Sequence, residues 1–299
     1  MNFEFEKKNP EKGGLRTVSR EREREGENLR EKRRRREREK TERAGEREKK
    51  REREREKKKK EKRKMFRAVV FGATGATGRE LVSELAHSES CTSVNAVTRR
   101  EIKKEDFPKV FPNISPQGVN KVKIKVVDYE RLSETIGDSC TSADVAFCCL
   151  GTTQSEAGGR AGFTKVDLDY TKAAAQECKK AGSISHFALV TAAGVNRSCP
   201  RFISNYIWTK ARAEEEVLSL DFPKGASIWH PGFLNRGEEL ASKRFTEKVA
   251  HWCGLSGLRV QDLAKSMRFY AEDLSKGKIT PKAEDVIEDK QIRSMCDSA

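Results

Sequence analysis

The sequence predicts an α/β fold built on a doubly wound parallel sheet, and three observations support this prediction. Short apolar runs alternate with amphipathic stretches from residue 65 onward. Several of these runs are apolar throughout, as strands buried on both faces are. The first run leads directly into Gly72, Gly75 and Gly78 and then into a helical pattern. In such sheets, ligands bind beyond the carboxyl ends of the strands.

Strands and helices are expected to alternate along this part of the chain. Strands are expected at residues 67 to 72, 93 to 99, 121 to 127, 144 to 150, 186 to 191 and 226 to 229, and helices at residues 76 to 87, 129 to 137, 164 to 181 and 203 to 219. Residues 101 to 120 contain Pro108, Pro112 and Pro116, so a surface loop is expected there in place of one crossover helix.

The basic character of the chain lies in its first 64 residues. They hold 29 Lys and Arg against 17 Asp and Glu, so they carry +12 of the net charge of +15 and leave +3 for residues 65 to 299. With almost no apolar side chains, residues 1 to 64 are expected to be a low-complexity tail, disordered or in fluctuating helix. A solvated charge run is the favoured interpretation over a nuclear-import signal or an arm that binds nucleic acid. A start of the natural chain at Met65 is a further alternative.

Residues 65 to 299 are long enough for one α/β domain with a core of ordinary size. Residues from about 233 to 299 are expected to contribute lid elements over a substrate. The sequence shows neither a secretory segment nor an apolar run long enough to cross a membrane, so a soluble intracellular protein is expected. Without an export signal, the eight cysteines are expected to be reduced thiols, and because none shows zinc-site spacing no metal is expected.

The glycine turn predicts a phosphate-binding site. Gly72 suits the tight turn after the strand, Gly75 allows backbone N–H groups to approach a pyrophosphate, and Gly78 allows the helix to pack close to the sheet. The anion would lie at the helix N-terminus, where unpaired N–H groups favour negative charge. A tight turn without a ligand is the alternative interpretation.

Two arginines predict which dinucleotide binds. Arg99 and Arg100 follow the second strand, where the adenosine ribose is expected. NAD calls for an acidic residue there, whereas guanidinium groups suit the 2′-phosphate of NADP. Asp128, after the third strand, is placed to reach the adenine edge, and Gly151, after the fourth, allows the backbone to approach the middle of the cofactor.

Tyr206 and Lys210 form the expected chemical pair. They lie four residues apart on an expected helix and therefore share one face. A free tyrosine has a pKa of about 10, and a nearby cation favours the phenolate. The pair therefore predicts a general acid/base, Tyr206, assisted by Lys210, which can also hold the nicotinamide ribose.

Several motifs together resemble the Tat-interacting oxidoreductase family, a branch of the atypical short-chain dehydrogenases with a Rossmann fold. The resemblance covers about residues 66 to 290 and excludes the tail. It is carried by Phe71 to Gly78, Arg99 with Arg100, Val127 to Glu130, Asp144 to Thr153, Gly162 to Asp167, Tyr206 to Lys210, and Pro231 with Gly232.

The resemblance implies a cofactor, site residues and partners. The implied site for NADP(H) comprises Thr74, Gly75, Ala76, Thr77, Arg99, Arg100, Leu150, Gly151, Tyr206 and Lys210, with Pro231, Gly232, Phe233 and Leu234 in a turn near the nicotinamide amide. Members are linked to apoptosis, transcription and nuclear import through protein partners that include import factors. A cytoplasmic protein, or one at the nucleus, is therefore expected, with mitochondrial association less favoured.

One departure from the family concerns mechanism. The family has a serine pair after the fifth strand, where a hydroxyl holds the substrate carbonyl; this chain has Thr191, Ala192 and Ala193. Thr191 keeps a hydroxyl that is expected to orient the substrate oxygen, but the two alanines have none. Losing one such donor costs roughly 100- to 1,000-fold in rate. His230, before Pro231, is interpreted as a packing residue.

Two functions therefore stay open at the level of sequence. The leading hypothesis is an NADPH-dependent oxidoreductase that transfers hydride to or from a small carbonyl substrate, with Tyr206, Lys210 and Thr191 as catalytic residues. The rival is a protein-binding regulator that holds NADPH with little or no turnover. A weaker third interpretation makes the tail an arm for nucleic acid or import factors, carried by the domain.

Overall fold

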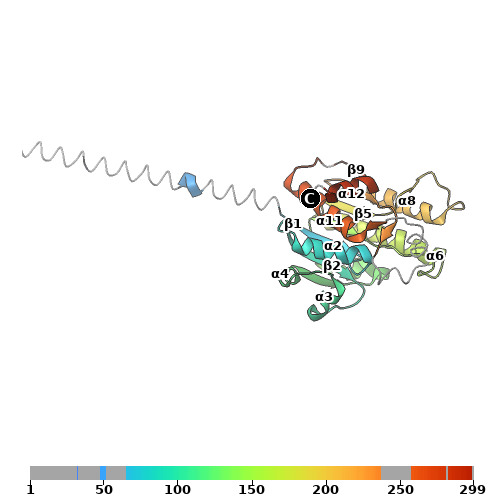
Figure 1. Ribbon diagram of the computed structural model, residues 1–299, viewed down its shortest axis with the longest axis horizontal. Coiled ribbons are helices and arrows are strands. Elements are labelled where there is room, and N and C mark those ends of the chain that lie inside the picture. Colours follow the sequence, from blue (N-terminus) through green and yellow to red (C-terminus); the bar gives the residue numbers. More distant parts are fainter. Residues whose placement is uncertain (1–31, 33–47, 52–64, 237–256, 281, 298–299) are drawn as a thin grey trace, which may run out of the picture. The chain divides into compact units, whose positions relative to one another are not determined.

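The computed structural model describes residues 32, 48–51, 65–236, 257–280 and 282–297 (Figure 1). The chain divides into two units, Met1–Glu61 and Lys62–Ala299. The predicted tail lies outside the described residues, apart from residues 32 and 48–51, which are helical. All features that follow belong to the second unit.

A sheet of seven parallel strands forms the centre of this unit, in the order β3-β2-β1-β4-β5-β6-β9. The strands are β1 (Phe66–Phe71), β2 (Cys91–Thr98), β3 (Val122–Val126), β4 (Val145–Cys148), β5 (His186–Val190), β6 (Ala226–His230) and β9 (Glu284–Glu288). The strand order reverses between β1 and β4, which pair directly. The predicted doubly wound Rossmann architecture is confirmed, and its switch point lies at the end of β1.

Helices cover both faces of the sheet because neighbouring residues of each strand face opposite cores. Along β1, Ala68 and Val70 belong to one apolar core and Val69 and Phe71 to the other. The first core lies under α2 (Ala76–His87) and α11 (Val260–Lys276), and the second under α5 (Leu132–Thr135), α7 (Tyr170–Ala181) and α8 (Asn205–Leu218). This two-faced burial explains the continuous apolar runs in the sequence.

The segment at residues 101 to 120 is more regular than the sequence predicted. It forms a 3₁₀ turn η1 (Lys104–Asp106) and two short helices, α3 (Phe107–Val110) and α4 (Pro116–Val119). Two of the prolines occupy first-turn positions, where a missing N–H costs no hydrogen bond. Phe107 and Phe111 are buried edge to face with ring centroids 5.4 Å apart. The prolines therefore start helices here, so the expected plain loop is wrong.

Two expected helices are interrupted. The first, after β3, consists of η2 (Tyr129–Arg131), α5 and η3 (Gly137–Ser139). The second consists of α6 (Arg160–Thr164), a π-helical segment η4 (Lys165–Asp169) and α7. A π-helical turn inserts one extra residue and is often found at functional sites. The side chain of Asp167 is buried within this segment.

The C-terminal segment extends the sheet. β9 pairs in parallel with β6, α11 packs on α2, and α12 (Asp289–Asp297) follows β9. β7 (Leu234–Asn235) and β8 (Leu258–Arg259) form a separate two-stranded sheet. Of the residues expected to form lid elements, those of α11, β9 and α12 instead extend the Rossmann unit. Residues 237–256 lie outside the described part of the chain. β9 escaped prediction because it is an edge strand with four polar or half-exposed residues.

Candidate functional site

The turn between β1 and α2 requires glycine at two positions. Gly72 has a φ of +72°, and a Cβ there would lie 2.8 Å from the carbonyl carbon of Cys149. A Cβ on Gly78 would lie 2.1 Å from the carbonyl oxygen of Gly72. Gly75 directly precedes α2 and its N–H bonds to the Gly72 carbonyl at 3.0 Å. The first N–H groups of α2 are thereby held at the switch point, where a pyrophosphate can approach.

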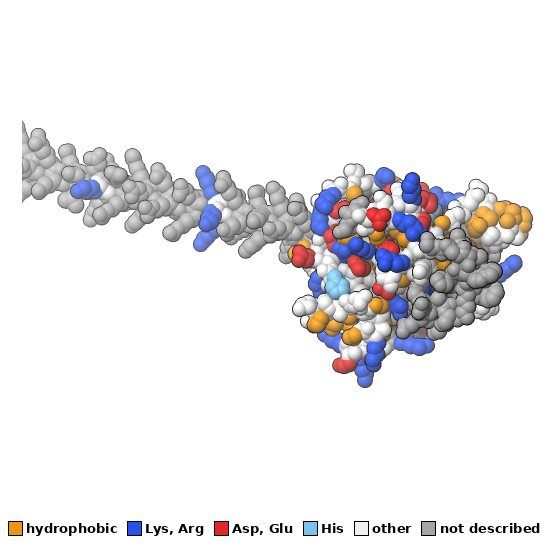
Figure 2. Space-filling model, in the orientation of Figure 1, with side chains coloured by type: hydrophobic (Ala, Val, Ile, Leu, Met, Phe, Trp, Pro, Cys, Tyr) orange, Lys and Arg blue, Asp and Glu red, His pale blue; other side chains and the backbone are white. Residues whose placement is uncertain are grey.

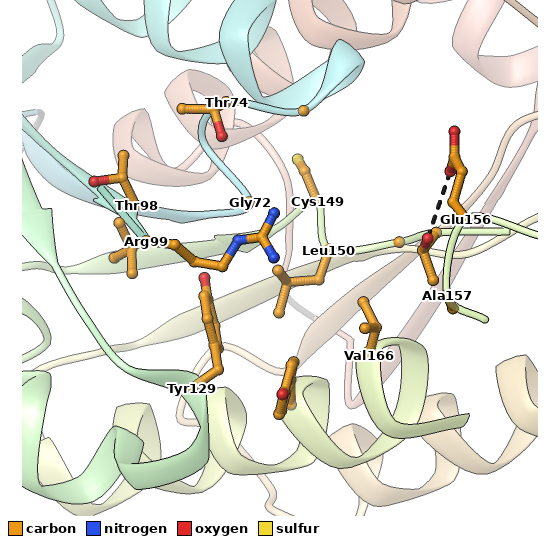
Figure 3. Close-up of a pocket in the computed structure, with 15 residues that line it drawn as sticks. Gly72, Thr74, Thr98, Arg99, Tyr129, Cys149, Leu150, Glu156, Ala157 and Val166 are labelled. Carbon is orange, nitrogen blue, oxygen red and sulfur yellow. Dashed lines mark hydrogen bonds between the residues drawn. The ribbon is translucent and has the colours of Figure 1, made fainter. Parts of the chain in front are cut away.

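A cavity of about 530 Å³ opens beside this turn (Figure 3). Arg99 extends its guanidinium across the cavity, with Leu150 on the opposite side and the Tyr129 hydroxyl directed toward Arg99. Tyr129 stacks on Tyr170, with ring centroids 5.2 Å apart. Burial raises the pKa of Tyr129, so its hydroxyl stays protonated. An aromatic wall facing a cation suits a nucleoside with a phosphate attached.

Asp128 does not line this cavity. Its carboxylate accepts a hydrogen bond from the Glu130 N–H at 3.0 Å and pairs with Arg131 at 3.4 Å, so it caps η2. The neighbouring Tyr129 lines the cavity, whereas Asp128 is absent from its described lining. The sequence signal for this arrangement is the capping preference of an aspartate before a helical turn, which keeps the Asp128 carboxylate on the η2 backbone.

A second cavity of about 450 Å³ adjoins Arg99 on its other side and gathers four cationic residues. They are Arg79 from α2, Arg99 and Arg100 after β2, and Lys109 from α3. Glu101 is the only acidic residue in its described lining. Within the described residues, Arg99 and Arg100 have no carboxylate partner. The predicted pair therefore lies together, and two further cations join it, of which Arg79 lies 3.8 Å from Glu80 and Lys109 lies 2.9 Å from Asp106.

A third cavity, of about 300 Å³, brings together most of the remaining predicted residues. It is lined by Gly75, Ala76, Thr77, Leu150, Gly151, Thr191, Ala192, Tyr206, Lys210, Pro231, Gly232, Phe233 and Leu234, among others. Gly75, Leu150 and Gly151 also line the first cavity, so the two are parts of one cleft along the strand ends. Residues separated by more than 150 positions thus meet at one edge of the sheet.

Tyr206 and Lys210 occupy very different environments on α8. The helix begins after Ser204, whose hydroxyl accepts a hydrogen bond from the Ile207 N–H at 3.2 Å. Tyr206 is 40% exposed and its ring stacks on Phe163, with centroids 5.5 Å apart. Lys210, one turn further, is buried. The structure therefore brings a partly exposed phenol and a buried ammonium into the lining of the same cavity.

Lys210 has a buried acidic partner that the sequence did not reveal. Its Nζ lies 2.7 Å from Oδ1 of Asp167, whose side chain is completely buried. Burial lowers the pKa of Lys210, but the Asp167 carboxylate and Tyr206 raise it, and the net direction is upward. Lys210 is therefore charged. The second oxygen of Asp167 accepts a hydrogen bond from the Thr152 N–H at 2.9 Å.

Thr191 lines the third cavity, but its hydroxyl is hydrogen-bonded to a buried carboxylate. It donates to Oε1 of Glu214 at 2.7 Å, and Glu214 is almost fully buried. A hydroxyl has a single proton, so while this bond persists Thr191 has none to donate to a substrate carbonyl. Ala192, which follows it in the cavity lining, offers no donor either. The predicted orienting role of Thr191 thus meets a competing hydrogen bond.

His230 is more than a packing residue. It is buried, with Nε2 2.8 Å from Glu214 Oε1 and Nδ1 3.1 Å from Glu288 Oε1. Both ring nitrogens can donate only in the imidazolium form. Burial lowers the pKa of His230, but the hydrogen bonds and charges of Glu214 and Glu288 outweigh it and raise the pKa. His230 thus bridges α8 and β9 through its two ring nitrogens, and the two carboxylates favour its protonated form.

The turn at Pro231 and Gly232 is held by contacts remote in sequence. The Pro231 carbonyl accepts a hydrogen bond from the Ala193 N–H at 2.8 Å. The Gly232 N–H donates to Oδ1 of Asp289, at the start of α12, at 2.9 Å. A Cβ on Gly232 would lie 3.1 Å from that carboxylate oxygen. The C-terminal helix thereby fixes one wall of the third cavity.

Neither a membrane-spanning helix nor a metal-binding cluster occurs in the part of the chain that the structure describes. No helix there is both long and apolar enough to cross a bilayer. Nor do three or more His, Cys, Asp or Glu side chains gather there in a way that could hold a metal ion. The residues that are present fit a dinucleotide, because the glycine cradle, the aromatic wall and the cations lie along one cleft.

Solved structures share this fold at low identity. A UDP-glucuronic acid 4-epimerase from Bacillus cereus in complex with NAD superposes with a TM-score of 0.53 and 13% identity, over 74% of this chain and 76% of that one. ElxO with NADP bound gives 0.52 and 14%, over 76% and 98%. At such identities the likeness shows the fold alone.

Curated relatives are closer in sequence. Protein HTATIP2 of Rattus norvegicus is 32% identical over 205 residues, 66% of this chain and 78% of the relative. Protein FMP52, mitochondrial, of Meyerozyma guilliermondii is 30% identical over 223 residues, 71% and 84% of the two chains. Further relatives, from other fungi, also bear mitochondrial names. These names overturn the expected cytoplasmic or nuclear location, which had ranked mitochondria last.

A family model described as NAD(P)H-binding matches residues 72–244, more than half of the chain. Its match begins at the glycine turn and includes Arg99, the Tyr206 and Lys210 pair and the Pro231 turn. Together with the HTATIP2 relative, it confirms the resemblance found in the motifs. The chain belongs to the NAD(P)H-binding Rossmann-fold family that includes HTATIP2, an oxidoreductase-like branch of the atypical short-chain dehydrogenases.

Proposed function

We propose that this protein is an NADPH-dependent oxidoreductase that acts on a small carbonyl compound. The observation that carries the proposal is that Tyr206 and Lys210 line the same cavity as Gly75 of the phosphate turn and Gly232 of the Pro-Gly turn. That cavity continues into the one beside Arg99. A cofactor stretched along the cleft would end beside the phenol, where a proton donor is needed.

The preference for NADPH over NADH rests on the second cavity. We call the Arg99 side of the cleft the adenosine end and the Tyr206 side the nicotinamide end. Arg79, Arg99, Arg100 and Lys109 surround the adenosine end. A 2′-phosphate adds about two negative charges, and guanidinium groups bind phosphate oxygens in charge-assisted pairs. Only NADPH presents that phosphate, so these cations discriminate between the two cofactors.

At the nicotinamide end, the chain's own residues bind, orient and supply a proton. The bound cofactor supplies the hydride. Tyr206, held at the cavity surface by stacking on Phe163, gives its phenolic proton to the substrate oxygen. Lys210, buried one turn away, holds positive charge in the lining of the same cavity. Tyr206 acts without a second hydroxyl donor from the β5 end, because Thr191 is bonded to Glu214 and residue 192 is alanine.

That missing donor favours a second candidate function. A protein that holds NADPH as a structural ligand, and binds a protein partner in a manner set by NADPH occupancy, needs the adenosine end but not an oxyanion donor. The hydrogen bond that Thr191 donates to Glu214 is the specific observation in favour of this candidate. It predicts tight cofactor binding with negligible turnover.

One experiment separates the two candidates. The full chain is titrated with NADPH and with NADH, and then incubated with NADPH and a panel of aldehydes, ketones and quinones while NADPH absorbance is followed. The oxidoreductase proposal expects tighter binding of NADPH than of NADH and oxidation with at least one carbonyl class. Tight NADPH binding without oxidation by any compound of the panel would refute the oxidoreductase proposal and leave the protein-binding regulator as the remaining candidate. Equal affinity for the two cofactors would refute the assignment of the 2′-phosphate site.

A further inference from the structure

Tyr129 carries a buried hydroxyl that is left without a hydrogen bond. The residue is 8% exposed, and within the described residues its hydroxyl oxygen is buried and has no hydrogen-bond partner. An unpaired buried hydroxyl destabilises a folded chain, so such groups are rare in proteins. One that opens on a cleft is therefore a candidate for contact with a ligand.

The hydroxyl opens on the adenosine end of the cleft. Tyr129 lines the first cavity together with Gly72, Thr98 and Arg99, among others. Figure 3 shows the hydroxyl directed toward Arg99, whose side chain extends across the cavity. The ring of Tyr129 stacks on that of Tyr170, with centroids 5.2 Å apart. The hydroxyl is therefore held in place before any ligand binds.

Two groups near the hydroxyl are donors and cannot accept its proton. Burial raises the pKa of Tyr129, whereas the Gly72 N–H and the charge of Arg99 act in the opposite direction, so both lie close to the phenol oxygen. A backbone N–H and a guanidinium group have no acceptor atom to offer. The missing acceptor is therefore expected from the ligand, and beside a guanidinium an anionic oxygen is favoured.

A second buried donor lies at the same end of the cleft. Nε of Arg79, on α2, is buried and has no hydrogen-bond partner within the described residues, since Oε1 of Glu80 lies 3.8 Å away. Arg79 lines the second cavity with Arg99 and Arg100. Arg99 lines both cavities, so the two unsatisfied donors border adjoining spaces. A phosphate has three strong acceptor oxygens and can accept from more than one donor.

We propose that the Tyr129 hydroxyl donates a hydrogen bond to the 2′-phosphate of NADPH, alongside Arg99, and thereby adds to the preference for NADPH over NADH. This inference rests on the proposed function and assigns to Tyr129 a part in cofactor specificity. Because burial keeps the hydroxyl protonated, it donates to the anion and does not repel it. The ring supplies an apolar wall for the nucleoside, and the hydroxyl supplies the discrimination.

The test measures ligand binding to the full chain and requires no turnover. Adenosine 2′,5′-bisphosphate and adenosine 5′-monophosphate are the first pair of probes, because they differ by the 2′-phosphate alone. Tyr129→Phe removes the hydroxyl and keeps the stacked ring. Its affinity for the bisphosphate is expected to fall by roughly tenfold or more, while its affinity for the monophosphate stays the same. Isothermal titration calorimetry measures both, and NADPH and NADH form the second pair of probes.

Stability of the chain without ligand gives a second readout. Since the hydroxyl is unpaired there, its removal is expected to leave the melting temperature of Tyr129→Phe unchanged or to raise it. A hydroxyl with a structural role would instead lower the melting temperature when removed. A weaker bisphosphate complex in an equally stable chain is thus the signature of a ligand contact.

Tyr170→Phe is the matched control. Tyr170 lines the same cavity and stacks on Tyr129, but its hydroxyl already donates to Glu130. Loss of that hydroxyl is expected to leave the ratio of bisphosphate to monophosphate affinity unchanged. An equal change of this ratio in Tyr170→Phe and Tyr129→Phe would overturn the specific role of Tyr129.

The outcomes separate this inference from the proposed function. If the natural chain prefers the bisphosphate and Tyr129→Phe keeps that preference, or loses affinity equally for both probes, the hydroxyl does not contact the 2′-phosphate. If the natural chain has no preference, the proposed NADPH site is refuted, and the role of Tyr129 with it. A chain with the expected affinities but no carbonyl reduction would refute the proposed reaction and leave the role of Tyr129 standing.

Discussion

At the adenosine end of the cleft, Arg99 and Arg100 have no carboxylate partner within the described residues, whereas at the nicotinamide end Lys210 is paired with Asp167 at 2.7 Å. Near the nicotinamide end a buried acid is paired as well, since Glu214 lies against His230 and Thr191. Figure 2 shows Lys and Arg side chains scattered over the face of the unit that it displays, so exposed cations are common there. Among the described residues, Lys210 and His230 are buried bases, and each lies against a carboxylate.

This difference follows from what a charge costs in each place. An exposed guanidinium is stabilised by water without a protein partner, so it can pair with the phosphate of a ligand. A buried ammonium without a counter-charge would lose its proton or destabilise the fold. The two ends therefore solve separate problems: the adenosine end supplies affinity, and the nicotinamide end supplies a balanced environment for proton transfer.

The largest effect is expected at the nicotinamide end. Tyr206→Phe removes the only phenol lining the third cavity, so carbonyl reduction is expected to fall by roughly 100-fold or more. NADPH affinity is expected to change little, because the adenosine end is untouched. Turnover and cofactor titrations on the same preparation measure both. Full activity in this variant would show that another group supplies the proton.

A substitution at the nicotinamide end is also expected to increase activity. Ala192→Ser restores a hydroxyl next to Thr191 in the cavity lining, without disturbing the bond to Glu214. Because one donor to the substrate oxygen is worth roughly 100- to 1,000-fold, an increase of tenfold or more in turnover is expected. Initial rates with the best carbonyl of the panel provide the measurement. Ala193→Ser, one residue further, is the matched control and should give no comparable gain.

At the adenosine end a smaller effect is expected. Arg99→Ala removes a charge-assisted contact worth about 1.5–3 kcal/mol, so NADPH affinity should fall by roughly tenfold or more while NADH affinity stays the same. Arg131→Ala is the control, since Arg131 is exposed and lines none of the three cavities. An equal loss for both cofactors would show that Arg99 contacts something other than the 2′-phosphate.

The smallest effect concerns stability and pH. The pKa of His230 is raised in the folded chain, so its protonated form favours folding. Its contribution is complete below the pKa of an unfolded histidine, about 6.5, and is lost as the pH rises through the folded value. The stability difference between the natural chain and His230→Gln should therefore be greatest in mild acid and shrink toward alkaline pH. Urea unfolding across that range tests the sign, and a difference that grows with pH would contradict it.

Local patterns predicted most of the fold and the residues of the cleft. Strand and helix periods are properties of short segments, so β1 to β6 and α8 appear close to where they were expected. The glycine turn was also predicted from local features, since Gly72 adopts a φ of +72° and a Cβ on Gly78 would meet the carbonyl oxygen of Gly72. At residues 101 to 120 the prolines led to the wrong prediction of a plain loop, whereas burial of Phe107 and Phe111 stabilises short helices there.

The pairing of charges in the site could not be predicted from such local patterns. Asp167 and Lys210 are 43 positions apart, and His230 and Glu288 are separated by 58. Whether a titratable side chain is exposed or buried, and which opposite charge lies within a few ångströms, depends on how the elements pack. The sequence by itself determined a dinucleotide-binding α/β fold and the candidate residues along its cleft. Only the tertiary structure decided which of their charges are compensated, because Coulomb interactions depend on distance and burial rather than on position in the chain.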